Sequence, residues 1–203
     1  MAGVNGSHIH QRPLAYAPAL ALRPEPAIDL VVIHCTELPD LAMARSFGER
    51  VLYADSASGN CGHFYIDRDG HIEQWVDLTR VAHHVRGFNE RSVGIELVNS
   101  GRYPHWLSAA QPQMQEPYAE VQVISLIGLL THLCQSLPSL CWLAGHEDLD
   151  RELVPAADDP ATLVRRKLDP GPLFPWERIR PATSLQPWSQ PAPATFKQTS
   201  GKL

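Results

Sequence analysis

The segment IDLVVIHCT, residues 28–36, is a nearly continuous run of apolar residues that ends in polar ones. A strand with one face in water alternates apolar and polar side chains, whereas a strand covered on both faces does not. The run therefore predicts a central, fully buried strand. Such a strand needs helices packed over its sheet, which favours an α/β or α+β fold.

The rest of the chain supplies partners for this strand. The predicted elements alternate in type: strands at 91–100 and 140–147, a hairpin at 63–76, and helices at 40–53 and 118–137. The hairpin is indicated by Asp69-Gly70 between two runs rich in β-formers, and the second helix by its broad apolar face. Together they predict a single α/β (α+β) domain with a central mixed β-sheet flanked by helices.

Proline is concentrated at both ends of the chain. Residues 1–26 and residues 181–203 contain four prolines each and show no sustained periodicity. We expect an N-terminal proline-rich arm over 1–26, the folded domain over 27–180, and a proline-rich tail over 181–203 that lies outside the compact core.

Composition excludes some functions. The net charge of the 203 residues is −5, and no basic block is longer than Arg165-Arg166-Lys167, so we expect no nucleic-acid partner. The four cysteines show no CxxC spacing and are interpreted as reduced thiols, with a disulfide between two of them as the alternative.

The N-terminal segment is a poor signal peptide. It lacks a cationic start, and Pro18 interrupts its apolar run. No other segment is long and apolar enough to predict a membrane span. The expected location is therefore the cytoplasm, or the periplasm if a leader has been removed. The sequence does not predict the oligomeric state.

Two histidines stand at the ends of predicted buried strands. His34 ends the first strand and His146 the last, and open sheets place their sites at such strand ends. With Asp169 they make a His, His, carboxylate set, which suits a catalytic zinc ion with one position left for water. The alternative is that each histidine is a satisfied polar residue at a strand edge.

Two further charged residues need a partner or a function. Glu96 lies on the less apolar face of a strand that otherwise belongs to the core, so it is either paired, for example with Arg91, or a general base whose pKa burial raises. In RRKLDPGPLFPW, residues 165–176, proline keeps the chain extended, so Lys167 and Asp169 face one common space. The alternative is an ion pair on a surface loop.

Five motifs in order resemble one family. VVIHCT, HFYIDRDGHIEQWV, RSVGIEL, GHEDLD and KLDPGPLFPW are similar to the motifs of zinc-dependent N-acetylmuramoyl-L-alanine amidases of the AmpD/AmiD type. The resemblance covers about residues 28–179. It implies the fold shared by T7-type lysozymes and peptidoglycan recognition proteins.

The resemblance also implies roles for single residues. His34, His146 and Asp169 fall on the family's zinc ligands, for one Zn²⁺ per chain. Glu96 falls on its catalytic carboxylate, and Lys167 on the lysine that stabilises the developing oxyanion.

Other positions depart from the family pattern or stay open. Residues 151–164 are inserted between the second histidine and the aspartate, where they border the site. AHHVRG places His83 where many relatives have tryptophan and His84 at the following histidine, which is either near substrate or only structural. Arg165 and Arg166 either contact substrate carboxylates or are solvated charges.

The function implied is hydrolysis of the amide between (anhydro-)N-acetylmuramic acid and L-alanine, in cytoplasmic recycling of muropeptides. An envelope amidase that cuts intact peptidoglycan is the alternative within the same chemistry. A module that binds peptidoglycan without cutting it, and a structural protein that holds no metal, are the rivals from other classes.

Overall fold

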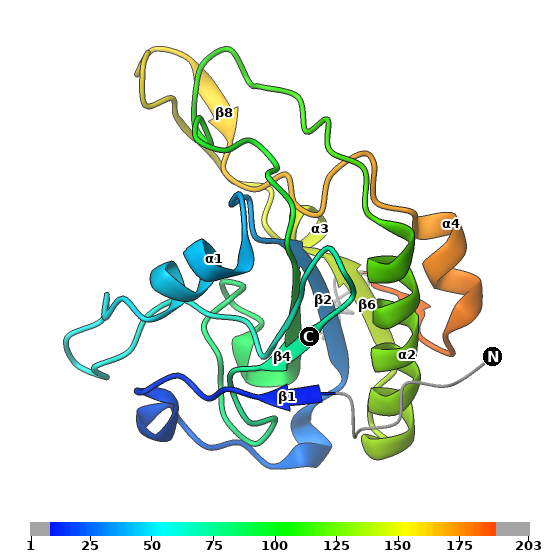
Figure 1. The fold of residues 1–203 in the computed structure, drawn as a ribbon. Helices are drawn as coiled ribbons and strands as arrows, with labels where there is room; N and C mark the ends of the chain where they lie inside the picture. Colours follow the sequence, from blue (N-terminus) through cyan, green and yellow to red (C-terminus); the bar gives the residue numbers. More distant parts are fainter. Residues whose placement is uncertain (1–8, 190–203) are drawn as a thin grey trace, which may run out of the picture.

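The computed structural model describes residues 9–189, and its centre is a seven-stranded mixed sheet with the order β1-β4-β3-β5-β2-β6-β9 (Figure 1). The strands are β1 (Ile9–Gln11), β2 (Leu30–Cys35), β3 (Phe64–Ile66), β4 (Ile72–Gln74), β5 (Ser92–Leu97), β6 (Trp142–Gly145) and β9 (Gln186–Pro187). Only β3 and β4 pair antiparallel; all other neighbours are parallel. The predicted mixed sheet is confirmed.

Strand β2 lies between β5 and β6, and all six of its residues are buried, as its apolar run predicts. Its side chains alternate between two cores. Ile33 packs with helix α2 (Glu120–Ser136), which covers one face of the sheet, whereas Val32 packs with Val85 and Ala144 on the opposite face. That opposite face also carries helix α1 (Leu41–Gly48) and the long loops.

The predicted first helix is shorter than its pattern indicates. Helix α1 begins after Asp40, whose carboxylate accepts a hydrogen bond from the Met43 amide, and ends at Gly48. The following residues 49–60 form an irregular loop because Tyr53 and Ser58 bridge to each other instead of continuing the helix. Two more helices, α3 (His146–Leu149) and α4 (Trp176–Ile179), have one turn each.

Both proline-rich segments contribute to the sheet. In the arm, β1 pairs with β4 at one edge, and Leu14 and Leu20 are buried. In the tail, β9 pairs with β6 at the other edge, and Leu185 is only 3% exposed. The expectation that the tail lies outside the core therefore does not hold for Leu185–Pro187, because Leu185 fills space beside α2. Residues 1–8 and 190–203 are outside the described part.

The inserted residues form a structure of their own. Strands β7 (Leu153–Pro155) and β8 (Leu163–Arg165) make a separate antiparallel hairpin that projects beyond the main sheet (Figure 1). All four cysteines are free, as predicted, with Cys35 and Cys61 buried. Over residues 9–189 no helix combines the length and apolar character needed to cross a membrane.

Candidate metal centre and catalytic cleft

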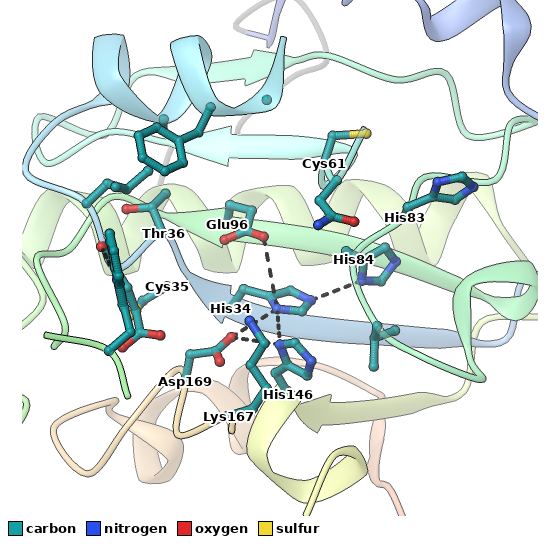
Figure 2. Close-up of a pocket in the computed structure, with 18 of the residues that line it drawn as sticks. His34, Cys35, Thr36, Cys61, His83, His84, Glu96, His146, Lys167 and Asp169 are labelled. Carbon is teal, nitrogen blue, oxygen red and sulfur yellow. Dashed lines mark hydrogen bonds and ion pairs between the residues drawn. The ribbon is translucent and has the colours of Figure 1, made fainter. Parts of the chain in front are cut away.

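The register of the parallel strands assembles the site. His34 on β2 is paired with Glu96 on β5, and Ile33 is paired with Gly145, so His146 follows directly beyond β6. Residues in register on parallel neighbours point to the same face of a sheet. The side chains of His34, Glu96 and His146 therefore meet on the face opposite α2, at the carboxyl ends of the strands (Figure 2).

Asp169 completes a triangle with the two histidines. Nδ1 of His34 lies 2.9 Å from Nδ1 of His146, and each nitrogen lies 3.0 Å from Oδ2 of Asp169. Two protons on the nitrogens would satisfy only the contacts to Asp169 and would leave two N–H groups facing each other. Three lone pairs directed at one common point suit a metal ion, which replaces all three contacts at once.

The surroundings of the triangle also fit a metal ion. All three residues are 2% exposed. Oδ1 of Asp169 and Nε2 of His146 are buried and have no hydrogen-bond partner, although buried polar groups are normally satisfied. Burial, followed by the neighbouring His146, lowers the pKa of His34 to about 4, which keeps its imidazole neutral and able to bind a cation. The predicted clustering of His34, His146 and Asp169 is confirmed.

The backbone around Asp169 is anchored by helix α3 and by the segment that precedes α2. The Glu147 amide in α3 donates to the Asp169 carbonyl at 2.9 Å, and the Tyr118 hydroxyl donates to the Pro170 carbonyl at 2.7 Å. Burial alone would raise the pKa of Asp169, but His146 and His34 outweigh it and hold the pKa well below its usual range. The carboxylate therefore stays ionised beside the two rings.

Lys167 is placed by a buried ion pair behind it. Arg102 bonds to both carboxylate oxygens of Glu37 at 2.6 and 2.7 Å, and the same guanidinium donates to the carbonyls of Arg165 and Arg166. This fixes the chain just before Lys167, whose side chain extends toward Asp169 and His34 (Figure 2). Lys167 and Asp169 line the same cavity, as the extended segment predicts.

Glu96 stands beside the triangle. Its Oε1 atom is 4.0 Å from Nδ1 of His34, and its side chain is 15% exposed. Burial, and then the charge of Asp169, raise the pKa of Glu96 to about 8, while Lys167 lowers it. The alternative pairing with Arg91 does not form, because Arg91 bonds to Asp29.

A cavity of about 810 Å³ opens above these residues. Its walls come from β2, α1, the 49–60 loop, the 83–89 loop and the segment before Asp169. Among the residues that line it are Tyr53, Asn60, His83, Arg86, Trp106 and Arg166. Such a volume suits a ligand much larger than a single amino acid.

The two arginines before Lys167 have different surroundings. Arg165 donates to the carbonyls of Glu147 in α3 and of Asp150 just after it, and is outside the cavity lining. Arg166 lines the cavity and pairs with Asp150 and Glu152. Of the two, only Arg166 is placed to meet a ligand.

Sequence reasoning missed the support behind the predicted residues. It did not find the Glu37–Arg102 pair, and no signal marks it, because its members are 65 residues apart. It also missed that His84 bonds to His34. The neighbouring His83 lies at the cavity surface, its ring 5.3 Å from that of Tyr53.

The profile of the N-acetylmuramoyl-L-alanine amidase family matches residues 24–172. The chain belongs to this family. The match contains every candidate residue, from His34 to Asp169, and thus confirms the family indicated by the five motifs.

Two curated amidases are similar to this chain. The 1,6-anhydro-N-acetylmuramyl-L-alanine amidase AmpD of Haemophilus influenzae is 27% identical over 190 residues, which cover 80% of this chain and 86% of AmpD. The N-acetylmuramoyl-L-alanine amidase AmiD of Escherichia coli is 31% identical over 108 residues, which cover 53% of this chain and 31% of AmiD. This chain therefore matches most of AmpD but less than a third of AmiD.

The fold is shared beyond the amidases. The solved structure of peptidoglycan recognition protein-LE in complex with tracheal cytotoxin superposes with a TM-score of 0.58 at 16% identity, covering 89% of this chain and 96% of that one. The predicted fold class, similar to peptidoglycan recognition proteins, is confirmed.

Proposed function

We propose that this protein is a zinc-dependent N-acetylmuramoyl-L-alanine amidase that hydrolyses the amide between (anhydro-)N-acetylmuramic acid and L-alanine. The observation that carries the proposal is the convergence of His34, His146 and Asp169 at the base of the cavity, with Glu96 and Lys167 beside them. Two histidines and a carboxylate are a ligand set of catalytic zinc sites, which keep one position open.

The residues divide the chemistry among them. His34, His146 and Asp169 would hold the zinc ion, which would supply Lewis-acid polarisation and lower the pKa of the attacking water. Glu96 accepts a proton from the attacking water and returns it to the alanine nitrogen as the C–N bond breaks, so the products are a lactyl carboxylate and a free amine. The Lys167 ammonium stabilises the negative charge that develops on the carbonyl oxygen.

The pKa of Glu96 suits that double role. Burial raises it to about 8 in the protein without metal, and the charge of Lys167 lowers it. A bound cation would lower it further, toward the neutral range in which one carboxyl group both accepts and returns a proton.

For the setting we propose recycling of soluble anhydro-muropeptides in the cytoplasm. The proposal is supported by the similarity to AmpD over most of both chains. The runner-up is an envelope amidase that cuts intact peptidoglycan, in the periplasm. A module that binds without cutting is disfavoured because Glu96 and Lys167 both face the metal-binding triangle.

One experiment separates these possibilities. The purified protein is analysed for metal and incubated in parallel with anhydro-muropeptide and with intact sacculi, and mass spectrometry detects released stem peptide. We expect one zinc per chain and stem peptide from the soluble substrate. Release only from sacculi would favour the envelope amidase, and zinc-loaded protein that releases no peptide from either would exclude the amidase.

A further inference from the structure

His84 uses both of its ring nitrogens inside the protein. Nδ1 lies 3.0 Å from Nε2 of the metal-site residue His34 (Figure 2). Nε2 lies 3.2 Å from the Ser92 hydroxyl. Although His84 reaches the cavity wall, it has no free polar atom to offer a substrate. Its function must therefore be sought in its contact with His34.

The donor and acceptor in each hydrogen bond of the chain Ser92–His84–His34 can be assigned by starting from Ser92. The Ser92 hydroxyl donates its one proton to the Phe88 carbonyl at 2.8 Å. It must then accept from the Nε2–H of His84, which leaves the lone pair of a neutral His84 on Nδ1. That lone pair accepts the Nε2–H of His34, so the lone pair of His34 lies on Nδ1, the atom that faces His146 and Asp169.

This order requires His84 to be neutral, and its surroundings keep it so. Its two ring nitrogens contact the His34 ring and the Ser92 hydroxyl, and neither contact brings a carboxylate that would pair with an imidazolium. A neutral imidazole has one donor and one acceptor, which is what a chain of hydrogen bonds with a single direction needs.

The position of the His84 ring is fixed from two sides. The Asn89 side chain accepts hydrogen bonds from the amides of His84 and Val85 at 3.0 and 2.8 Å, which holds the loop against the sheet. Beneath the ring lies Gly94 of β5, where an added Cβ atom would stand 2.6 Å from Cγ of His84. The absence of a side chain at Gly94 therefore makes room for the His84 ring.

We propose that Ser92 and His84 are positioning residues that fix the tautomer of His34, so that Nδ1 of His34 is the metal ligand. The inference rests on the metal site of the proposed function. Outer-sphere partners of this kind orient a histidine ligand and raise its basicity, and their loss costs about 10–100-fold in metal affinity.

The test compares His84→Leu with His84→Asn, two side chains of nearly the same shape. Asparagine places an oxygen where Nδ1 of His84 was, so it still accepts from His34, whereas leucine does not. We expect zinc affinity, measured by chelator competition, to fall about 10–100-fold in His84→Leu and less in His84→Asn. Ser92→Ala should give an intermediate loss, because His84 keeps its contact with His34 but loses the partner that fixes its tautomer. The substitution leaves the Ser92 backbone carbonyl, which accepts a hydrogen bond from Arg23, in place. Ser125→Ala, which removes a hydroxyl on α2 bonded to the Gly70 carbonyl, is the matched control and should bind zinc as the parent does.

Ring ¹⁵N spectra of the metal-free protein provide a readout that depends on neither zinc nor turnover. We expect His84 in the Nε2–H form, and a gain of the Nδ1–H form in Ser92→Ala. A parent protein with His84 in the Nδ1–H form, or a folded His84→Leu variant with undiminished zinc affinity, would overturn the inference. A parent protein that binds no zinc would instead overturn the proposed function.

Discussion

The floor of the cleft, formed by His34, Glu96 and His146, and its rim, formed by the β7–β8 hairpin, are held in place by different interactions. His34 and Glu96 belong to the sheet and His146 follows β6 directly, so their positions follow from the register of buried strands. The β7–β8 hairpin buries Ala156 and Val164, and exposed polar groups link it to its neighbours: Asp158 accepts from Ser108 and Ala109, and Glu152 pairs with Arg86. Core packing thus positions His34, Glu96 and His146, whereas residues 151–165 do not line the cavity and reach its wall through the pair of Glu152 with Arg86.

Two ion pairs, one buried beneath the floor and one exposed at the rim, differ in the same way in the stability that they contribute. The side chains of Glu37 and Arg102 beneath the floor are 7% and 3% exposed, whereas those of Arg86 and Glu152 at the rim are 67% and 45% exposed. Breaking a buried pair costs about 3–5 kcal/mol, because it leaves a charge without compensation. An exposed pair contributes about 0–1 kcal/mol.

The largest effect is expected at the floor. Glu96→Gln keeps the shape of the side chain but removes the proton acceptor, so kcat should fall about 10²–10⁴-fold while zinc content stays at the level of the parent. Peptide release under saturating substrate, with metal analysis of the same sample, measures both. Glu120→Gln on the outer surface of α2 serves as the control. Undiminished turnover in Glu96→Gln would remove this carboxylate from the mechanism.

Asp169→Ala is expected to act on the metal itself. Loss of a ligand should lower zinc affinity by more than the roughly 10–100-fold that loss of an outer partner costs, and activity should fall in parallel and recover in part with added zinc. Dialysis against a chelator series measures the affinity. Asp55→Ala in the exposed 49–60 loop is the comparison. Equal zinc retention in both variants would contradict the assignment of Asp169.

The two ion pairs give a direct test of the contrast between floor and rim. Arg102→Met should lower the free energy of unfolding by about 3–5 kcal/mol and also reduce kcat, because Arg102 holds the chain before Lys167. Arg86→Met should cost at most about 1 kcal/mol. Urea denaturation measures both, and similar losses in the two variants would refute the distinction.

At the rim, Asp158→Ala should alter selection of substrate more than chemistry. The change removes the contacts that tie the hairpin to Ser108 and Ala109. We expect KM for muropeptides to change while kcat stays within about twofold, which is the pattern of altered ground-state binding. A fall in kcat with unchanged KM would mean that the hairpin takes part in the reaction itself.

The smallest effect concerns acid stability of the loop between β5 and α2. Burial alone would raise the pKa of Glu116, but hydrogen bonds from Arg68 and Ser100 outweigh it and lower the pKa to about 2. A carboxyl group with a depressed folded-state pKa stabilises the protein above its unfolded value of 4.5, and this stability is lost as the pH falls toward 2. Glu116→Gln should therefore be less stable than the parent at pH 7 and nearly equal to it at pH 2. A stability difference that is independent of pH would contradict this explanation.

The sequence predicted the residues of the floor because buried strands and the polar residues at their ends produce a recognisable pattern in the sequence. A continuous apolar run indicated β2, Asp69-Gly70 indicated the hairpin of β3 and β4, and polar residues at strand ends indicated the site. It did not recover β1, β9 or the β7–β8 hairpin. These strands have three, two, three and three residues, too few to show a period, and three of the four lie within or beside proline-containing segments.

The contacts of irregular loops were likewise beyond prediction. His84 lies outside the predicted elements, between the hairpin at 63–76 and the strand at 91–100. Its bond to His34 depends on the path of the 83–89 loop. The pairing of Glu37 with Arg102 depends on the fold of two segments that are distant in the sequence. Spacing alone carries no information about such contacts.

Strands β1 and β9 also have a consequence for how much of the chain is needed. They occupy the two outermost positions of the sheet, and the family match over residues 24–172 includes neither. A protein trimmed to the matched residues would expose the hydrogen-bonding groups of β4 and β6, which are templates for pairing between molecules. In β9, Pro187 has no N–H to offer a further strand. The segments outside the family match would then govern resistance to aggregation, while the segments inside it carry the candidate catalytic residues.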